Sequence, residues 1–196
     1  MNFRHLPNFI TLLNLFSGSI AIIMAFEGNL STASYFIGLA VVFDFFDGFL
    51  ARLLNKYSDI GKELDSLADI VSFGVAPSII MFHLLKLSLN IDKLPLSFDI
   101  TTLVDIVVLL SAFLITVFSA LRLAKFNVDT RQKDSFIGLP TPASAILIAS
   151  LPVIMHNSDN FLIKQVILSI YFLVPLIGRT FNFRGCVLEF KRFKVS

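Results

Sequence analysis

Hydrophobic residues run through this chain in stretches long enough to cross a membrane, separated by short polar segments. An apolar helix needs about 20 residues to cross the hydrocarbon core of a bilayer, and the chain has room for six. Their approximate bounds are Asn8–Phe26, Ser31–Leu54, Gly61–Leu85, Thr101–Leu123, a fifth stretch that follows Phe136–Pro142 and lasts to about Met155, and Phe161–Ile177. The pattern predicts an all-α protein with six transmembrane helices, the third of them kinked at Pro77.

Composition supports an integral membrane protein. The 196 residues are 56% hydrophobic and 15% charged, and the mean hydropathy is +0.82, whereas about a quarter of a soluble domain is charged. We expect one membrane domain over residues 1–196, and a first helix that is retained because it lacks a small-residue cleavage site. The net charge of +2 gives no reason to expect a nucleic-acid partner. A single cysteine, Cys186, excludes an intramolecular disulfide.

The basic residues predict the orientation. With six helices, both termini and the second–third and fourth–fifth connections share one face, and that face holds 13 of the 16 Lys and Arg residues. Because basic residues concentrate in cytoplasmic loops, we expect both termini on the cytoplasmic side, with the cell inner membrane as the location. The basic, phenylalanine-rich tail (about 179–196) is expected to lie along the membrane surface.

Four aspartates interrupt the apolar sequence where the second expected helix ends and the third begins. Asp44 and Asp47 are three residues apart, and Asp65 and Asp69 are four apart. On helices these spacings place each pair on one face. Ionisable side chains at membrane depth are costly and mark functional sites. We therefore expect one site, built from both pairs, near the cytoplasmic face.

The chemistry of these residues indicates a metal site. Four facing carboxylates cannot all stay ionised in a dry site without cations. Oxygen ligands without His or Cys favour hard ions, Mg²⁺ or Mn²⁺ and also Ca²⁺, and two such ions can hold the attacking and leaving oxygens of a phosphoryl displacement. Gly48 and Gly61 would let a backbone or a ligand come close. Arg52 offers a planar donor group suited to a phosphate.

Two other interpretations of the aspartates remain. In the first, the aspartates form a buried ion-pair cluster with Arg52, although one arginine would leave three acidic charges unpaired. In the second, they line the cation path of a divalent-cation transporter, although such a path needs polar groups along the whole membrane depth.

A polar stripe occupies the first expected helix. Asn8, Thr11 and Asn14 recur at three-residue spacing. Small polar side chains in this arrangement either hydrogen-bond to neighbouring helices or contact a polar substrate.

The stretch from Asp44 to Asp69 resembles the signature of the CDP-alcohol phosphatidyltransferase family. All eight fixed positions match in the pattern Asp44-x2-Asp47-Gly48-x2-Ala51-Arg52-x8-Gly61-x3-Asp65-x3-Asp69. The resemblance implies a six-helix membrane enzyme, usually a homodimer, that displaces CMP from a CDP-linked lipid with the hydroxyl of a second substrate.

The resemblance also implies a role for each residue. Two divalent cations, Mg²⁺ or Mn²⁺, would be held by Asp44, Asp47, Asp65 and Asp69. Asp69 would in addition act as general base toward the acceptor hydroxyl. The CDP portion of CDP-diacylglycerol would contact Gly48, Arg52 and Ser58.

Four further segments resemble the phosphatidylserine synthase branch of that family: Leu6–Gly18, Leu64–Pro77, Arg122–Val128 and Phe136–Ala143. They imply that L-serine is the acceptor, and that phosphatidylserine and CMP are the products. Arg122, Lys125 and Asn127 would then bind the carboxylate of serine or the lipid phosphate. Glycerol 3-phosphate or another alcohol remains an alternative acceptor.

Overall fold

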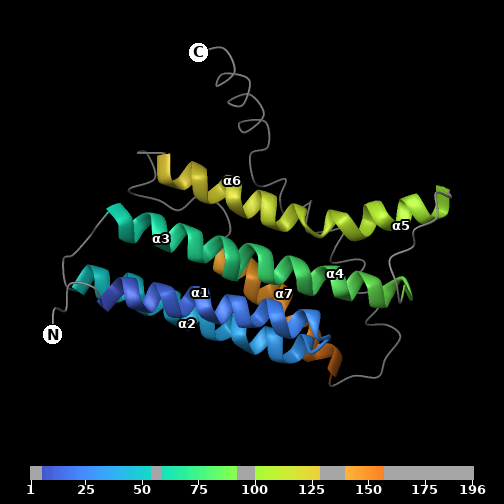
Figure 1. Ribbon diagram of the computed structural model, residues 1–196, viewed down its shortest axis with the longest axis horizontal. Helices are drawn as coiled ribbons and strands as arrows, with labels where there is room; N and C mark the ends of the chain where they lie inside the picture. Colours follow the sequence, from blue (N-terminus) through green and yellow to red (C-terminus); the bar gives the residue numbers. More distant parts are fainter. Residues whose placement is uncertain (1–5, 54–58, 92–99, 129–139, 157–196) are drawn as a thin grey trace, which may run out of the picture.

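A computed structural model of the chain describes residues 6–53, 59–91, 100–128 and 140–156 (Figure 1). Its helices are α1 (Leu6–Phe26), α2 (Leu30–Leu53), α3 (Asp59–Asp69), the π-helix η2 (Ile70–Val75), α4 (Ala76–Ser88), α5 (Ile100–Ser111), α6 (Leu114–Val128) and α7 (Thr141–His156). No strand occurs in these four ranges. The predicted all-α class is confirmed over this part of the chain.

Three helical segments are long and apolar enough to cross a membrane: Pro7–Phe26, Ile60–Ser88 and Leu103–Asn127. Helix α2 has 24 residues but carries charged side chains in its last third, and α7 has only 16 residues. The sixth expected helix, Phe161–Ile177, lies outside the described residues, as do the tail and Ser58. The three segments indicate a membrane-associated protein, and the count of six helices stays a prediction.

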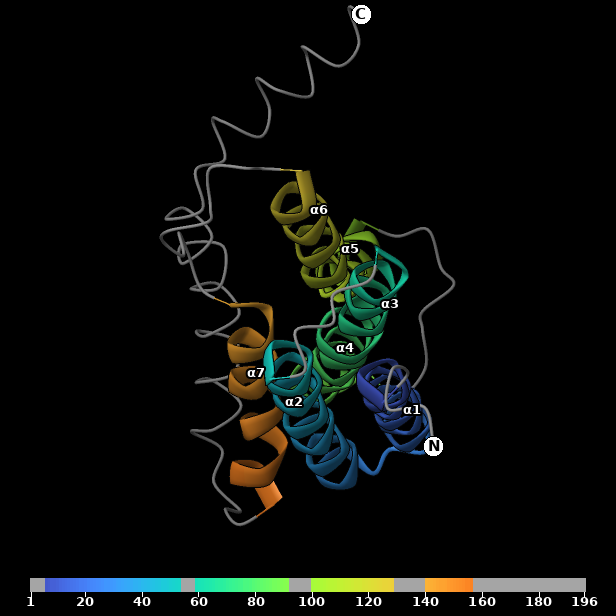
Figure 2. The same cartoon turned by 90° about the vertical axis from the view of Figure 1, so that its left-hand side faces the viewer.

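The long helix made of α3, η2 and α4 lies in the middle of the bundle. In Figures 1 and 2 the α1–α2 hairpin lies on one side of it and α5–α6 on the other, while α7 packs against α2 and α4. The hairpin turns at Gly28, whose positive φ of 77° suits glycine. Beyond it, the Asn29 Oδ1 accepts the backbone N–H of Thr32 at 3.3 Å, which caps the start of α2.

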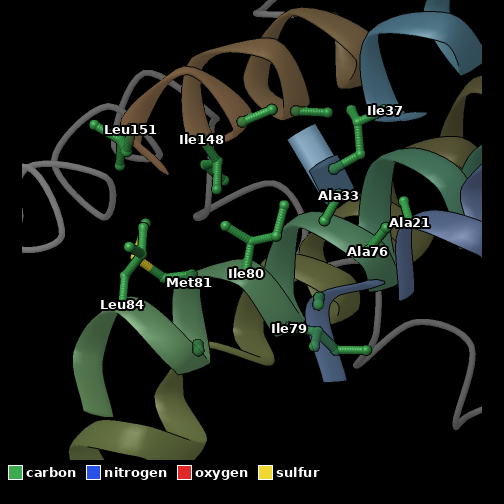
Figure 3. Close-up of a cluster of buried hydrophobic side chains, with 14 of the residues drawn as sticks. Ala21, Ala33, Ile37, Ala76, Ile79, Ile80, Met81, Leu84, Ile148 and Leu151 are labelled. Atoms are coloured by element: carbon green, nitrogen blue, oxygen red, sulfur yellow. The ribbon is translucent and has the colours of Figure 1, made fainter. Parts of the chain in front are cut away.

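Small and aliphatic side chains fill the core (Figure 3). Ile80, Met81 and Leu84 of α4 face Ile148 and Leu151 of α7, and all five are buried. Alanines line the contacts among α1, α2 and α4, which lets these backbones approach closely: Ala21, Ala33 and Ala76.

The outward faces of the bundle are also apolar. Large side chains such as Phe9, Phe16 and Phe45 are more than half exposed. So much exposed apolar surface is expected where a protein faces lipid rather than water.

The third helix differs from its predicted form. We expected one helix over Gly61–Leu85 with a kink at Pro77, but the helix runs from Asp59 to Ser88 and its irregularity is the π-helix η2. Pro77 has no N–H to donate, and its ring crowds the carbonyl four residues earlier. The wider π turn ends just before it, where the N–H of Ala76 donates to the carbonyl of Val71, five residues back.

The fourth expected helix, Thr101–Leu123, is divided into α5 and α6. At the division the N–H groups of Ala112 and Phe113 donate to carbonyls only three residues back, at 3.2 and 3.1 Å. The next turn is tied to the central helix, because Thr116 Oγ1 donates to the carbonyl of Gly74 at 3.2 Å and lies 2.8 Å from Ser78 Oγ. The uniform hydrophobicity of this stretch gave no signal for the division.

Candidate metal centre

Three aspartates from two helices meet at the end of the bundle where α2 ends and α3 begins. Asp44 and Asp47 of α2 and Asp65 of α3 each offer a carboxylate oxygen, and these oxygens all lie within 4.8 Å of one another. Asp47 is buried, and the other two are partly buried. The i, i+3 spacing on α2 turns both of its aspartates toward α3. The arrangement could hold a metal ion.

Asp69 lies beside this cluster, one helical turn after Asp65. It is only 8% exposed, and its carboxyl group lies close to that of Asp44. Asn14 of α1 also contacts Asp69, donating from Nδ2 to Asp69 Oδ1 at 3.4 Å. The structure therefore brings together all four of the predicted aspartates.

The unpaired oxygens at this site fit a hard cation. Within the described ranges, three buried side-chain atoms have no hydrogen-bond partner: Asp47 Oδ2, Asp65 Oδ1 and Asn14 Oδ1. Buried polar atoms are normally paired, and neighbouring carboxylates repel one another. The donor set is oxygen only, which suits Mg²⁺ or Mn²⁺. The residues at this site therefore fit a cation of this kind.

Two of the residues expected to contact the CDP portion lie near the C-terminal end of α2. Gly48 is exposed, and a Cβ built on it meets no heavy atom within 4 Å. Of the two roles expected for Gly48, close contact with another backbone is absent among the described residues, and room for a ligand remains. Arg52 is exposed in the last turn of α2, and Ser58 lies outside the described residues.

The three residues expected at the acceptor lie on α6 but do not converge on one point. Asn127 contacts α3, because its Nδ2 donates to Ser66 Oγ at 2.9 Å and its carbonyl accepts from Lys62 Nζ at 3.3 Å. Arg122 contacts α7, donating from Nη1 to Thr141 Oγ1 at 3.0 Å. Lys125 is exposed. Asn127 thus touches the helix that carries Asp65, while Arg122 lies toward α7.

Helix α1 supplies residues that the sequence did not assign to the site. The hydroxyl of Thr11 lies beside the Asp47 carboxyl and also donates to the carbonyl of Pro7 at 3.1 Å. Asn14 reaches Asp69, as described above. Their three-residue spacing was the available signal, and it left open whether the stripe served helix packing or a polar ligand. In the structure both residues contact other helices, and they do so at the acidic cluster.

Two comparisons with known proteins bear on the site. The profile of the CDP-alcohol phosphatidyltransferase family matches residues 4–177. A CDP-diacylglycerol–serine O-phosphatidyltransferase of Helicobacter pylori (strain J99) is 37% identical over 158 residues, which cover 80% of this chain and 60% of that protein. The chain thus spans about 60% of the length of this relative and of its counterpart from strain 26695.

Two other relatives widen the comparison. The Bacillus subtilis protein, also named CDP-diacylglycerol–serine O-phosphatidyltransferase, is 36% identical over 148 residues, covering 76% of this chain and 75% of that protein. The archaetidylserine synthase of Methanothermobacter thermautotrophicus is 35% identical over 151 residues, covering 76% of this chain and 58% of that protein.

Proposed function

Because this chain belongs to the CDP-alcohol phosphatidyltransferase family, we propose that it transfers a phosphatidyl group from CDP-diacylglycerol to L-serine. The products are phosphatidylserine and CMP. The observation that carries the proposal is the cluster of Asp44, Asp47 and Asp65 with Asp69 beside it. This is the acidic site that a metal-assisted phosphoryl transfer needs.

The names of the relatives support serine as the acceptor. Two of those described above are named for CDP-diacylglycerol and serine, and the third is named for archaetidylserine. The lipid part of these names changes while serine stays. An acceptor such as glycerol 3-phosphate would bring a phosphate of its own. Helix α6 offers two cations for it, Lys125 and Arg122, and Arg122 lies toward α7.

Asp69 is the base in this proposal. It removes the proton from the serine hydroxyl, whose oxygen forms a bond to the phosphorus that carries diacylglycerol. The bond from that phosphorus to the bridging oxygen breaks, and the bridging oxygen leaves with CMP. A hydroxyl needs such a base within hydrogen-bond reach at neutral pH. The buried setting of Asp69, against Asn14 and Asp44, suits a group whose task is proton transfer.

The other aspartates would hold the cations. Asp44, Asp47 and Asp65 supply the oxygen ligands, and Asp69 can add one from its place beside Asp44. Bound Mg²⁺ or Mn²⁺ would supply positive charge that offsets the negative pyrophosphate and the departing CMP. Gly48 and Arg52 would contact the CDP portion from the C-terminal end of α2, where Gly48 leaves space and Arg52 is exposed.

The membrane placement follows from the same proposal. We place the site at the cytoplasmic edge of the inner membrane, in a single six-helix domain with both termini cytoplasmic and with a second copy as partner. CDP and serine then reach the aspartates from water, while the acyl chains remain in the bilayer. The apolar outer faces of the helices support this arrangement.

The decisive experiment uses the purified protein with CDP-diacylglycerol, Mn²⁺ or Mg²⁺, and a panel of labelled alcohols. We expect release of CMP that requires both the cation and L-serine, with labelled phosphatidylserine as the product. Chelation by EDTA should stop the reaction, and added Mn²⁺ should restore it.

Other outcomes identify the alternatives. Transfer to glycerol 3-phosphate, with none to serine, would keep the family chemistry but replace the acceptor. Uptake of Mn²⁺ into proteoliposomes without any CMP release would instead support a divalent-cation transporter.

A further inference from the structure

Asn14 has an unusual environment for a buried amide. The side chain has no exposed surface, and its Nδ2 donates to Asp69 Oδ1 at 3.4 Å. Its Oδ1 is also buried and has no hydrogen-bond partner among the described residues. A buried oxygen without a donor lowers stability. Stability alone therefore does not explain an asparagine at this position.

The backbone around Asn14 is held against the central helix. Ser72 Oγ of η2 donates to the carbonyl of Asn14 at 3.1 Å. One turn further along α1, Gly18 lies so close to η2 that an added Cβ would be 2.7 Å from the Ser72 Cα. These two contacts fix α1 along the α3–η2 helix, and they keep the Asn14 amide next to Asp69.

We infer that Asn14 is a positioning residue for Asp69. Its N–H holds one carboxylate oxygen of Asp69 and leaves the other available to the cation or the acceptor proton. Since Asn14 has no exposed surface, it acts through Asp69 and not by touching a substrate. The catalytic part of this inference rests on the proposed function, whereas its effect on cation binding does not.

The test is Asn14→Leu, which keeps a similar size but removes both the N–H donor and the unpaired oxygen. Partners of metal-binding side chains typically contribute 10- to 100-fold to activity or metal affinity. We therefore expect kcat to fall about 10- to 100-fold, and Mn²⁺ affinity, measured by electron paramagnetic resonance, to fall about tenfold. The KM for CDP-diacylglycerol should stay as in the wild type. The melting temperature in detergent should be equal to that of the wild type or higher.

Ser17→Ala is the matched control on the same helix. It removes the hydrogen bond from Ser17 Oγ to the carbonyl of Phe36, 2.8 Å long and away from the aspartates. We expect a lower melting temperature with turnover per folded molecule and Mn²⁺ affinity as in the wild type. The two variants thus separate a contact that serves the site from one that serves packing.

The inference is overturned if Asn14→Leu keeps wild-type kcat and Mn²⁺ affinity, whether or not its melting temperature falls. If Asn14→Leu does not fold, Asn14→Ala, which adds no bulk, is judged by the same two measurements. If the wild-type protein transfers nothing from CDP-diacylglycerol, the proposed function fails, and Mn²⁺ affinity alone then decides the role of Asn14.

Discussion

At the scale of single residues, the four aspartates are close together but differ in their surroundings. Asp44, Asp47 and Asp65 share one cluster of carboxylate oxygens. Asp69 lies one turn further along α3 than Asp65, where it accepts a hydrogen bond from the Asn14 amide and lies close to Asp44. This difference supports a division of labour in which three residues mainly hold cations and the fourth also takes a proton.

Asp69→Asn tests that division. The amide has nearly the shape of the carboxylate but cannot accept the proton of the acceptor hydroxyl, so we expect kcat to fall by about 10²- to 10⁴-fold. Binding of CDP-diacylglycerol, followed by equilibrium dialysis with labelled lipid in detergent, should persist. Wild-type turnover in this variant would remove Asp69 as the base.

Gly48→Ala tests the proposed contact with the CDP portion. A Cβ at Gly48 meets nothing within 4 Å, so the fold should tolerate it and gain up to about 1 kcal/mol from the better helix propensity of alanine. We expect a higher KM for CDP-diacylglycerol, because the methyl group occupies space meant for the nucleotide. Steady-state kinetics and thermal unfolding measure the two effects separately.

Gly38→Ala is the control for this change. Gly38 also lies on α2 with open space around it, but nearly three turns before Gly48. It should show the same tolerance of the methyl group without the change in KM. An equal KM in both variants and the wild type would contradict a role for Gly48 in binding CDP.

At the scale of elements, the close approach of α1 to η2 holds the site together. It places Asn14 against Asp69 and Thr11 beside Asp47. Helix α1 packs against both aspartate-bearing helices, α2 and α3, and also against η2. The distance between α1 and the central helix should therefore control activity as well as stability.

Gly18→Ala tests this dependence. Its Cβ would clash with Ser72 Oγ and lie 2.7 Å from Ser72 Cα. The second atom is backbone, so the helices must move apart, at a cost of about 1–3 kcal/mol for overpacking. We expect a lower melting temperature and, in the protein that remains folded, reduced turnover. A variant as stable and active as Gly38→Ala would show that the contact is looser than the structure places it.

The elements also show how far the sequence alone can be interpreted. Hydrophobic stretches predicted α1 and α2 to within two residues at each end, because apolar length and flanking polar residues are local properties. The spacing of the aspartates predicted the cluster for the same reason. The η2 segment and the division between α5 and α6 were missed. Hydrophobicity does not change at either place, and the contacts of Gly74 and Ser78 with Thr116 join positions about 40 residues apart. Asn14 was noticed, but its partner lies 55 residues away.

At the scale of the whole molecule, the proposal requires that the aspartates open toward the cytoplasm. The turn between α1 and α2 and the start of α3 then lie on opposite sides of the membrane. Each carries an exposed glutamate, Glu27 in the turn and Glu63 on α3. These positions can therefore report the orientation of the bundle.

Cysteine labelling measures that orientation. In a Cys186→Ser background expressed in bacterial cells, Glu27→Cys should react with a membrane-impermeant maleimide applied from the periplasmic side. Glu63→Cys should react only after the inner membrane is opened, because basic loops favour the cytoplasm. The reverse pattern would contradict a cytoplasmic site, and labelling of both in intact cells would contradict a membrane between them.

The π turn links the number of residues in the helix from Asp59 to Ser88 with the direction of the aspartates on α3. A residue that is extra to the regular α-helical repeat sets Asp65 and Asp69 at a different angle, relative to α4, from the one an unbroken helix would give them, by about 100°. Regular α-helix in place of η2, with no residue removed, would still leave a helix long enough to span the bilayer and insert. The aspartates of α3 would then point away from those of α2. Deleting one residue within Ile70–Val75 removes the extra residue and should keep more activity than inserting one residue there, which turns the aspartates away. Membrane insertion and metal-dependent release of CMP measure the two effects separately.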